Sequence, residues 1–460
     1  MSRDHAALLH ELDAALPGGS VLSDPDVTDR YRFDRTSWVT PGWPAAVALP
    51  STTAEVAAAV KVAAAHEVPI VPRGAGSSLC GGSQAVDGAL TLSLEKLDRI
   101  VDLDPVDQLI TVEPGVINAD VSAAAWDDGL FYPPDPASKD FCSIGGNVAT
   151  NAGGLCCVKY GVTRDWVQRL EVVLADGTVI ETGHDTLKGV AGLDLTGLFV
   201  GSEGTLGIVT RVTLRLRRRP QGTATAVAVF PTLDAAGRAV ADLATSGATP
   251  SLLEIMDNPT INVVEDAMRM GLDRDAAALL LLSSDSPEPL RGREVADAAQ
   301  RCESAGATEV AATDDAEAAD ALLQARRMVG PVLEQLGEPI WDDVCVLRSR
   351  IPDLLGRIGD IAAAHDTRVF TFGHAGDGNM HPVLLVDRDD PDSRERALTA
   401  FDRIVEATLE LGGTITGEHG VGSIKAPFLE REVGTANLAL QRRIKHTLDP
   451  DGLLNPGRWL

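Results

Sequence analysis

Residues Phe370–Val383 read FTFGHAGDGNMHPV, and Asp377-Gly378 stands between the two strand-like halves of this stretch. Asp-Gly between apolar runs is a strong local signal for a β-hairpin, because a type I′ turn needs positive φ at both central residues. A two-residue turn would set His381 directly opposite His374, with their Cβ atoms about 4.5–5.5 Å apart. Two imidazoles at that separation can share one divalent metal ion, or they can simply decorate a hairpin.

A carboxylate and an imidazole stand together in a second short stretch, TITGEHGVG at Thr414–Gly422. Glu418 is suited to be a third metal ligand, and His419 is suited to be a neighbouring base. Two histidines and one glutamate match the preferences of Zn²⁺, Mn²⁺ or Fe²⁺, and they leave positions open for water or substrate. The two stretches together predict a catalytic metal site rather than a closed structural one.

The composition limits the classes of protein and partner. At 460 residues the chain is too long for one ordinary core, so two or three domains are expected. A net charge of −27 argues against nucleic acid or an anionic membrane surface as the main partner. No stretch reaches the ~18 apolar residues of a membrane span, and the N-terminus lacks the pattern of a signal peptide. The six cysteines lack the spacing of a disulfide framework, so we expect reduced thiols in a cytoplasmic protein.

Three glycine-rich segments precede the hairpin. They are PRGAGSSLCGG at 72–82, SIGGNVATNAGG at 143–154 and LFVGSEGTLGIVT at 198–210. The backbone N–H groups of the first could wrap a pyrophosphate, although Leu79 replaces the third glycine of the usual dinucleotide fingerprint. A backbone without large side chains lets a ligand approach closely, and plain surface loops are the alternative.

Local patterns predict the elements around these segments. Thr52 and Glu55 form a capping box before an alanine-rich helix, and Asp176-Gly177 joins two short strands. Arg211, Arg215, Arg217 and Arg219 share one face of a strand, which favours a solvated edge strand. Beyond residue 220 the chain alternates strands at 224–230, 252–256 and 277–282 with helices at 232–246, 290–305 and 314–329. This alternation predicts a second α+β domain.

The ordered set of three glycine-rich segments, HAGDGNMH hairpin, GEHG stretch and NPG tail closely resembles the FAD-linked 2-hydroxyacid dehydrogenases of the vanillyl-alcohol oxidase type. Within that family, the chain looks like the D-lactate dehydrogenase and glycolate oxidase large-subunit group, over residues 30 to 458. The resemblance implies an α+β fold with a two-subdomain, PCMH-type FAD-binding domain at 1–219, whose core is about 40–219. It also implies a substrate (cap) domain with the metal site at 220–425 and a C-terminal return to the FAD-binding domain at 426–460.

The resemblance implies a bound FAD. No histidine lies in the Arg73–Gly82 loop, so we expect non-covalent FAD, although Cys80 and Cys142 lie near the expected cofactor. The residues implied to hold it are Pro72, Arg73, Gly74, Ala75, Gly76, Ser77, Ser78, Leu79, Pro134, Asp135, Ser138, Ser143, Gly145, Gly146, Asn147, Ala149, Thr150, Asn151, Gly153, Glu203, Gly204, Gly207, Ile208 and Asn455.

By the same resemblance, His374, His381 and Glu418 bind a divalent metal, with zinc favoured and manganese or iron as alternatives. His419 is the base that takes the hydroxyl proton of a D-2-hydroxyacid, while the flavin accepts the hydride from C2. Arg326 stands where the family carries an arginine that clamps the substrate carboxylate. A cation on the surface of a helix is the alternative interpretation of Arg326.

Three positions depart from the family pattern. Leu323 replaces a tryptophan that is common ahead of the arginine, and Trp341 stands where the 2-hydroxyglutarate enzymes carry a lysine. Pro382-Val383 follows the second histidine, where those enzymes place an asparagine. The lysine and the asparagine of those enzymes suit the distal carboxylate of 2-hydroxyglutarate. Their absence here favours a short or apolar substrate such as D-lactate or glycolate. A buried core position is the alternative account of Trp341.

Two other classes of function remain open. A metallohydrolase could use the same His/His/Glu site with a metal-bound water, but it would leave the glycine-rich segments unexplained. A flavoprotein subunit could be active only within an electron-transfer assembly. The chain has no C-x2-C cluster motif, so its electrons would leave to oxygen, a quinone, an electron-transfer flavoprotein, a cytochrome or an iron–sulfur subunit. The sequence also leaves the oligomeric state open, a homodimer included, and allows peripheral membrane attachment through a partner.

Overall fold

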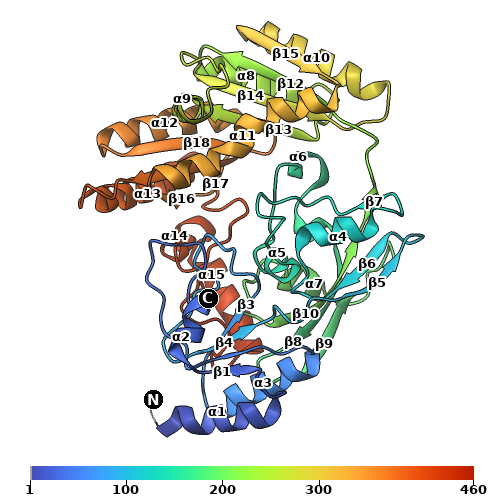
Figure 1. Ribbon diagram of the computed structural model, residues 1–460, viewed down its shortest axis with the longest axis vertical. Coiled ribbons are helices and arrows are strands. Elements are labelled where there is room, and N and C mark those ends of the chain that lie inside the picture. Colours follow the sequence, from blue (N-terminus) through green and yellow to red (C-terminus); the bar gives the residue numbers. More distant parts are fainter. Residues whose placement is uncertain (1–2) are drawn as a thin grey trace. The chain divides into compact units, whose positions relative to one another are not determined.

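The computed structural model describes residues 3–460. Two units make up the chain (Figure 1). The first consists of Met1–Gly154, Gly161–Arg219 and Glu418–Leu460, and the second consists of Leu155–Tyr160 and Pro220–Gly417. Both combine helices with sheets that contain antiparallel pairs, which confirms the predicted α+β class. No helix within the described residues has the length and hydropathy of a membrane span.

A four-stranded sheet opens the first unit. Its strands are β1 (Val21–Leu22), β2 (Ala46–Ala48), β3 (Ile70–Arg73) and β4 (Leu90–Ser93), in the order β1-β2-β4-β3. Helices α1 (Arg3–Ala15) and α3 (Thr53–Ala65) contribute Leu8 and Val56 to the apolar core of this sheet. The predicted start of α3 is confirmed, because Thr52 Oγ1 accepts a hydrogen bond from Glu55 N at 3.2 Å.

The C-terminal segment covers the free edge of that sheet. Helices α14 (Ala426–Val433) and α15 (Thr435–Leu448) lead into it. Ile70 N donates to Leu453 O, and Asn455 N donates to Ile70 O, both at 2.7 Å. These bonds satisfy backbone groups of β3 that would otherwise face solvent at a sheet edge. The C-terminal segment thus packs against the sheet of the first unit.

A five-stranded antiparallel sheet forms the rest of the first unit, in the order β5-β6-β10-β8-β9. Its strands are β5 (Ile100–Asp104), β6 (Leu109–Val112), β8 (Val167–Val173), β9 (Val179–Gly183) and β10 (Ile208–Arg215). Shorter elements beside it are β7 (Leu130–Phe131), β11 (Arg217–Arg218), α4 (Asn118–Ala125), α5 (Ile144–Thr150) and α7 (Leu195–Phe199). As predicted, Asp176-Gly177 lies in the turn between β8 and β9.

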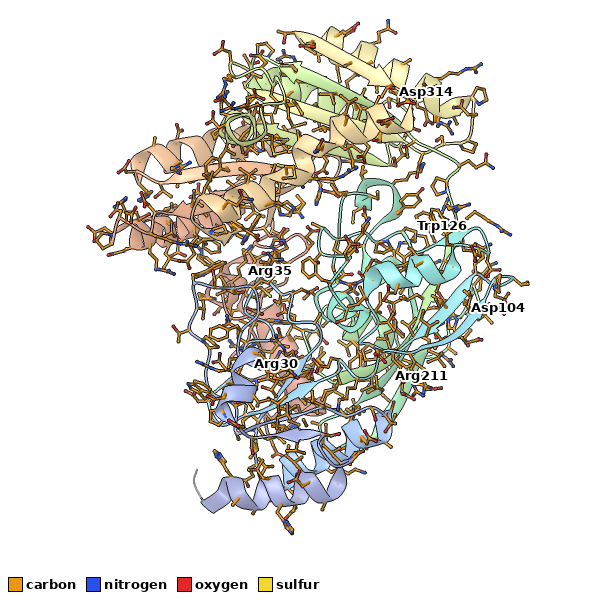
Figure 2. The ribbon with its side chains drawn as sticks, viewed as in Figure 1. Arg30, Arg35, Asp104, Trp126, Arg211 and Asp314 are labelled. Carbon is orange, nitrogen blue, oxygen red and sulfur yellow. The ribbon has the colours of Figure 1, made fainter. Side chains whose placement is uncertain are left out.

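The arginine-rich strand is not the edge strand that the sequence predicted. Strand β10 pairs with β6 on one side and with β8 on the other. Arg211, labelled in Figure 2, remains partly exposed and lies 3.4 Å from a carboxylate oxygen of Glu171. Arg219, beyond the strand, stacks over the Trp126 ring at 4.0 Å. The strand is central because its opposite face carries the buried residues Val212 and Leu214.

An eight-stranded sheet forms the second unit, in the order β15-β12-β14-β13-β18-β19-β16, with β17 also paired to β19. Its strands are β12 (Ala224–Phe230), β13 (Leu252–Asp257), β14 (Ala278–Ser284), β15 (Glu309–Thr313), β16 (Glu338–Trp341), β17 (Val344–Cys345), β18 (Arg368–His374) and β19 (Asn379–Val386). Its helices are α8 (Leu233–Ala244), α9 (Asn258–Met268), α10 (Leu290–Ala305), α11 (Ala316–Leu336), α12 (Ile351–Ala364) and α13 (Ser393–Glu410). The predicted strands and helices of this region are confirmed, and α11 extends seven residues past its predicted end at 329.

Helices α9 and α11 pack on one face of this sheet. Met256 of β13, Phe372 of β18 and Val383 of β19 join Val264 and Val329 of those helices in one apolar cluster. Alternate residues of a strand point to the same face, so Glu254, His374 and His381 also stand on the α9/α11 face. Three polar side chains thus extend an otherwise apolar surface.

The register of the β18–β19 hairpin differs from the prediction. His374 pairs with Asn379, and His381 pairs with Phe372. The turn therefore has four residues, Ala375 to Gly378, and the prediction of a two-residue type I′ turn with directly opposite histidines was wrong. His374 O accepts hydrogen bonds from the N–H groups of Asp377 and Gly378, at 3.2 and 2.9 Å.

Tertiary contacts at Gly378 account for the longer turn. Gly378 has φ +92°, and a Cβ built on it would lie 1.9 Å from Val346 O. Val346 N in turn donates to Gly378 O at 3.1 Å. The turn is thus shaped by the neighbouring segment after β17, which local turn propensity does not include. His374 and His381 stay on one face as diagonal neighbours.

A six-residue segment, Leu155–Tyr160, belongs to the second unit although the residues before and after it in the sequence belong to the first. Leu155–Tyr160 ends in the short helix α6 (Cys157–Tyr160). Val158 fills the space beside Gly376, where a Cβ would lie 2.6 Å from a Val158 methyl carbon. Lys159 and Tyr160 both donate to the Asp285 carboxylate. These contacts fix the segment to the hairpin turn and to the end of β14.

Candidate functional site

The two hairpin histidines meet at their Nε2 atoms. Both side chains are buried, and His374 Nε2 lies 3.2 Å from His381 Nε2. Two ligands of a tetrahedral zinc ion, each about 2.0–2.1 Å from the metal, lie about 3.3 Å apart. The same separation also fits a hydrogen bond between the two rings. The donor pair therefore has the geometry that one divalent ion needs, although the predicted cross-strand register was wrong.

Glu254 holds the opposite side of the His374 ring. It is directly opposite His374 in the β13–β18 ladder and has no exposed side-chain area. Glu254 Oε1 lies 2.6 Å from His374 Nδ1. Burial would raise the pKa of Glu254, but the charges of His374 and Arg326 outweigh it and hold that pKa below its usual value. We missed this residue in the sequence, where a single acid within the apolar strand LLEIM was the available signal.

Arg326 of α11 is largely buried rather than a surface cation. Its Nε donates to Glu254 Oε2 at 2.7 Å, and its guanidinium carbon lies 4.4 Å from the centre of the Phe372 ring. Trp341 meets Phe372 edge to face, with 6.4 Å between ring centroids. The alternative that placed Arg326 on a solvated helix surface is therefore wrong. The guanidinium group of an arginine held in this way is an ordered, planar hydrogen-bond donor beside aromatic rings.

Asp343 lies beside the second histidine and holds the segment that leads to Glu418. Its side chain is fully buried, and its Oδ1 lies 3.8 Å from His381 Nδ1. Asp343 Oδ2 accepts hydrogen bonds from Thr416 Oγ1 at 2.7 Å and from Gly417 N at 2.9 Å. Gly417 directly precedes Glu418 in the chain. We did not predict a role for Asp343, although the acidic pair Asp342-Asp343 between two strands was a signal in the sequence.

The stretch after Glu418 and His419 belongs to the first unit, where Glu203 holds it. Glu203 Oε1 accepts a hydrogen bond from Val421 N at 2.7 Å, and Oε2 accepts one from Gly422 N at 2.8 Å. Gly422 also packs against Cys80, because a Cβ there would lie 2.0 Å from Cys80 O. One carboxylate thus fixes the backbone two and three residues beyond His419.

The Glu203 carboxyl changes its charge near neutral pH. Burial raises the pKa of Glu203 to about 7, although the hydrogen bonds from Val421 and Gly422 favour the charged form. The ordinary value is 4.5, so between these pH values the folded chain binds more protons than the unfolded chain. The free energy of unfolding contributed by Glu203 therefore falls as pH rises through this window, by about 3 kcal/mol in all.

Replacing Glu203 by glutamine removes this titration. Relative to wild type, the unfolding free energy of E203Q should therefore increase by about 2–3 kcal/mol between pH 5 and pH 8. Urea denaturation of the FAD-free protein at both pH values measures this change. Glu181→Gln is the matched control, because the Glu181 side chain is 60% exposed. If the difference in unfolding free energy between E203Q and wild type is the same at pH 5 and at pH 8, the expectation is contradicted.

The predicted FAD segments converge in the first unit. Ser143 Oγ accepts hydrogen bonds from Ala75 N at 3.2 Å and from Gly146 N at 3.4 Å, so it joins the first segment to the second. Glu203 N donates to Ala149 O at 2.8 Å, which joins the second to the third. Asn455 Nδ2 donates to Glu203 O at 2.6 Å. The region offers backbone N–H groups and serine hydroxyls, the donors that suit a phosphate.

Several predicted FAD residues use their side chains within the protein. Arg73 is buried, and its guanidinium folds back over its own loop, where it donates to Ser83 O at 3.5 Å. Asn147 accepts from Asn118 Nδ2 at 2.9 Å, and Asn151 accepts from Arg164 N at 2.8 Å. The first unit also contains the other predicted FAD positions, which are Pro72, Gly74, Gly76, Ser77, Ser78, Leu79, Pro134, Asp135, Ser138, Gly145, Thr150, Gly153, Gly204, Gly207 and Ile208. Residues 144–150 form the helix α5. From the sequence we expected only a glycine-rich segment without large side chains.

The cysteines near these segments are buried thiols. Burial raises the pKa values of Cys80 and Cys142 above their usual range. The two thiols therefore remain protonated at neutral pH, and a protonated thiol is a poor nucleophile. This environment supports the expectation that FAD is held without a covalent bond.

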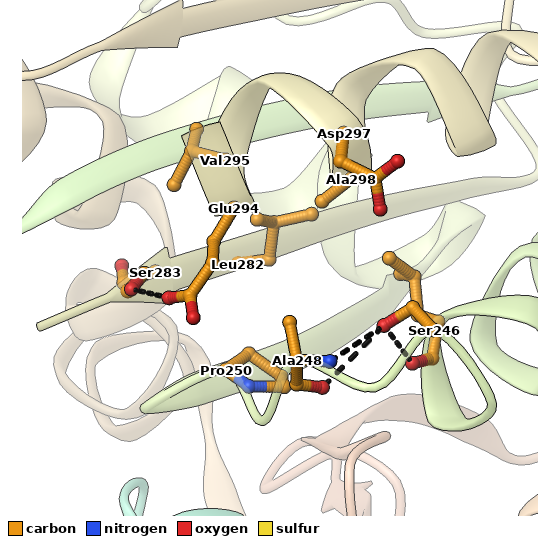
Figure 3. Close-up of a pocket in the computed structure, with 11 residues that line it drawn as sticks. Ser246, Ala248, Pro250, Leu282, Ser283, Glu294, Val295, Asp297 and Ala298 are labelled. Carbon is orange, nitrogen blue, oxygen red and sulfur yellow. Dashed lines mark hydrogen bonds between the residues drawn. The ribbon is translucent and has the colours of Figure 1, made fainter. Parts of the chain in front are cut away.

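The second unit also has a small cavity, whose lining residues do not include the predicted site residues. Figure 3 shows it between β14, α10 and the segment after α8, with Ser246, Ala248, Glu294 and Asp297 among its lining residues. Its volume is about 20 Å³, which is space for about one water molecule. Ser284 Oγ donates to the Glu294 carboxylate beside it. The cavity is too small for an organic acid.

Comparison with known proteins identifies domains across nearly the whole chain. Residues 44–183 match the FAD binding domain, and residues 219–459 match the FAD linked oxidases, C-terminal domain. The glycolate oxidase subunit GlcD of Bacillus subtilis is 43% identical, over 93% of this chain and 91% of that protein. The D-lactate dehydrogenase of Anaerostipes hadrus is 31% identical, over 95% of this chain and 94% of that protein.

The fold is also found in a solved structure. The structure of p-cresol methylhydroxylase with substrate bound aligns with this chain at a TM-score of 0.83 and 18% sequence identity. The alignment covers 100% of this chain and 97% of that chain. At this identity the likeness speaks for the fold alone. It confirms the predicted PCMH-type architecture.

Proposed function

The chain belongs to the FAD-linked oxidases, and on that premise we propose that it oxidises a small D-2-hydroxyacid, D-lactate or glycolate, with the help of a divalent metal ion. It is an FAD-linked oxidoreductase acting on 2-hydroxyacids, like the relatives that match along most of its length. The observation that carries the finer proposal is the pair of buried Nε2 atoms, 3.2 Å apart, beside an arginine. A metallohydrolase would leave the FAD binding domain without a role.

Each candidate residue has a distinct task. His374, His381 and Glu418 would hold the divalent ion, zinc by preference, and the ion would lower the pKa of the substrate hydroxyl. His419 takes the hydroxyl proton. Arg326 holds the substrate carboxylate through the edge of its guanidinium that is not bound to Glu254. The converging glycine-rich segments would hold FAD, which would supply the hydride acceptor that no side chain can provide.

The aromatic groups favour a short substrate. Phe372 packs between Arg326 and the His381 ring, whose centroid lies 5.7 Å from its own. Trp341 extends this wall. A second carboxylate would meet apolar edges here, and burying it without a partner would be costly. D-Lactate and glycolate lack such a group, which supports them over 2-hydroxyglutarate.

A visible absorption spectrum before and after anaerobic addition of substrate tests the proposed function. We expect a yellow protein that is bleached by D-lactate or glycolate, because hydride transfer reduces the flavin. L-Lactate and D-2-hydroxyglutarate are the matched comparisons and should bleach it at least about 100-fold more slowly. Rapid bleaching by D-2-hydroxyglutarate alone would overturn the substrate assignment. A colourless protein that FAD cannot reconstitute would overturn the flavoenzyme.

The electron acceptor is a separate part of the proposal. One relative is named as a subunit of glycolate oxidase, and we propose that this chain also passes its electrons to a partner protein or a quinone. A cytoplasmic location, with peripheral membrane attachment through that partner, remains a prediction.

A further inference from the structure

A single charged residue interrupts the apolar strand β13. Glu254 stands between Leu253 and Ile255, on the same face of the sheet as Met256 and Phe372. Placing a carboxylate in this position is unfavourable unless charged partners compensate for the lost water. Glu254 has two such partners, and they come from β18 and α11.

Each Glu254 oxygen is committed to a different functional candidate. Oε1 lies 2.6 Å from His374 Nδ1, and Oε2 lies 2.7 Å from Arg326 Nε. Both distances are those of short, charge-assisted hydrogen bonds. Because the residue sits opposite His374 in the β13–β18 ladder, the backbone fixes one of these contacts.

The first contact decides which nitrogen of His374 can bind a metal. Nδ1 needs a proton to donate to the Glu254 carboxylate, so in the neutral imidazole it is Nε2 that carries the lone pair. That lone pair belongs to the atom that meets His381 Nε2. A carboxylate that fixes the tautomer and angle of a metal-binding histidine also strengthens it as a ligand.

The second contact orients Arg326. Its Nε is engaged by Glu254 while its plane lies over the Phe372 ring. The terminal nitrogens then have a fixed direction in which they can meet a carboxylate in two parallel hydrogen bonds. Without Glu254, the long arginine side chain would regain rotational freedom.

We propose that Glu254 is a positioning residue that links the metal ligand His374 to the substrate clamp Arg326 through one shared carboxylate. The inference rests on the proposed function for the roles of those two residues. It predicts that the affinity for the metal and the affinity for the substrate depend on the same side chain, which touches neither.

Glu254→Gln tests the inference with metal affinity as the readout. The carboxamide keeps the shape, but its single oxygen can accept from only one partner, and its NH₂ group faces the other donor. Zinc affinity, measured by competition with a chromophoric chelator on the FAD-loaded protein, should fall by about 10–100-fold. The dissociation constant for D-lactate, measured on the metal-saturated protein, should rise as well.

Asp257→Asn is the matched control, because it neutralises another hydrogen-bonded carboxylate of the same strand. Asp257 accepts hydrogen bonds from Thr260 N at 2.9 Å and from Thr371 N at 3.0 Å. Asparagine is as good an N-cap as aspartate, so helix α9 should keep its start. D257N should bind zinc as wild type does.

The outcomes separate the two proposals. Zinc affinity in E254Q equal to that of wild type overturns the inference and leaves the proposed function standing. An equal loss of zinc affinity in D257N also overturns the inference, since the loss of any carboxylate charge on β13 would then suffice. A wild-type protein that binds no divalent ion overturns both. If E254Q does not fold, Glu254→Asp decides: it keeps the charge but is one methylene shorter, and an unchanged zinc affinity in E254D overturns the link.

Discussion

Replacing His419 by alanine is expected to lower the rate of flavin reduction by about 10²–10⁴-fold while FAD stays bound. The proposed base would be lost, and water would have to take the hydroxyl proton instead. The loop beyond it should keep its shape, because Glu203 holds Val421 and Gly422 through their backbone N–H groups. Anaerobic stopped-flow absorption with D-lactate measures the rate, and the spectrum of the protein measures its FAD content.

His446→Ala is the control for H419A. His446 lies in the same unit, on an exposed position of α15, and its loss should leave the rate unchanged. Added imidazole should restore part of the rate in H419A if the missing group is a base. A near-normal rate in H419A would remove His419 from the mechanism.

Replacing His381 by alanine is expected to remove the divalent ion and most of the turnover. Mutating a residue that only hydrogen-bonds to a metal ligand typically lowers metal affinity by about 10–100-fold. Removing the ligand itself should therefore lower the metal affinity by more than about 100-fold. Elemental analysis after dialysis measures occupancy. FAD should remain bound, because the predicted FAD segments belong to the other unit.

Chelation of the wild-type protein provides the comparison for H381A. A chelator should reproduce the loss of activity, and added zinc or manganese should restore the wild-type protein but not the variant. Full metal occupancy in H381A would contradict the assignment of His381 as a ligand.

Local signals in the sequence were sufficient for most elements. The Thr52 cap, strand 224–230 and helix 290–305 follow from side chains within a few residues of one another. The hairpin register was wrong because Gly378 packs on Val346, a contact that turn propensity does not contain. Helix α5 was missed because four of its seven residues are glycine, asparagine or threonine, which are poor helix formers, and its Ser143 cap went unrecognised.

The candidate site was predictable only in part. Its histidines stand in one short stretch, so the sequence alone brings them together. Glu254 lies 120 residues from His374 and reaches it only through the pairing of β13 with β18. Asp343 reaches the chain before Glu418 through tertiary hydrogen bonds. Such supporting residues come from strand order, which no local pattern specifies.

The pairing of Ile70 with the C-terminal segment has a consequence for how the chain matures. During translation, the strand β3 emerges early, but the partner that covers its edge lies at 453–455. The second unit can therefore close before the first has all of its residues. Until synthesis reaches that point, β3 exposes an unpaired edge, the kind of surface that invites aggregation and chaperone binding. The first unit to begin folding is thus the last that can finish.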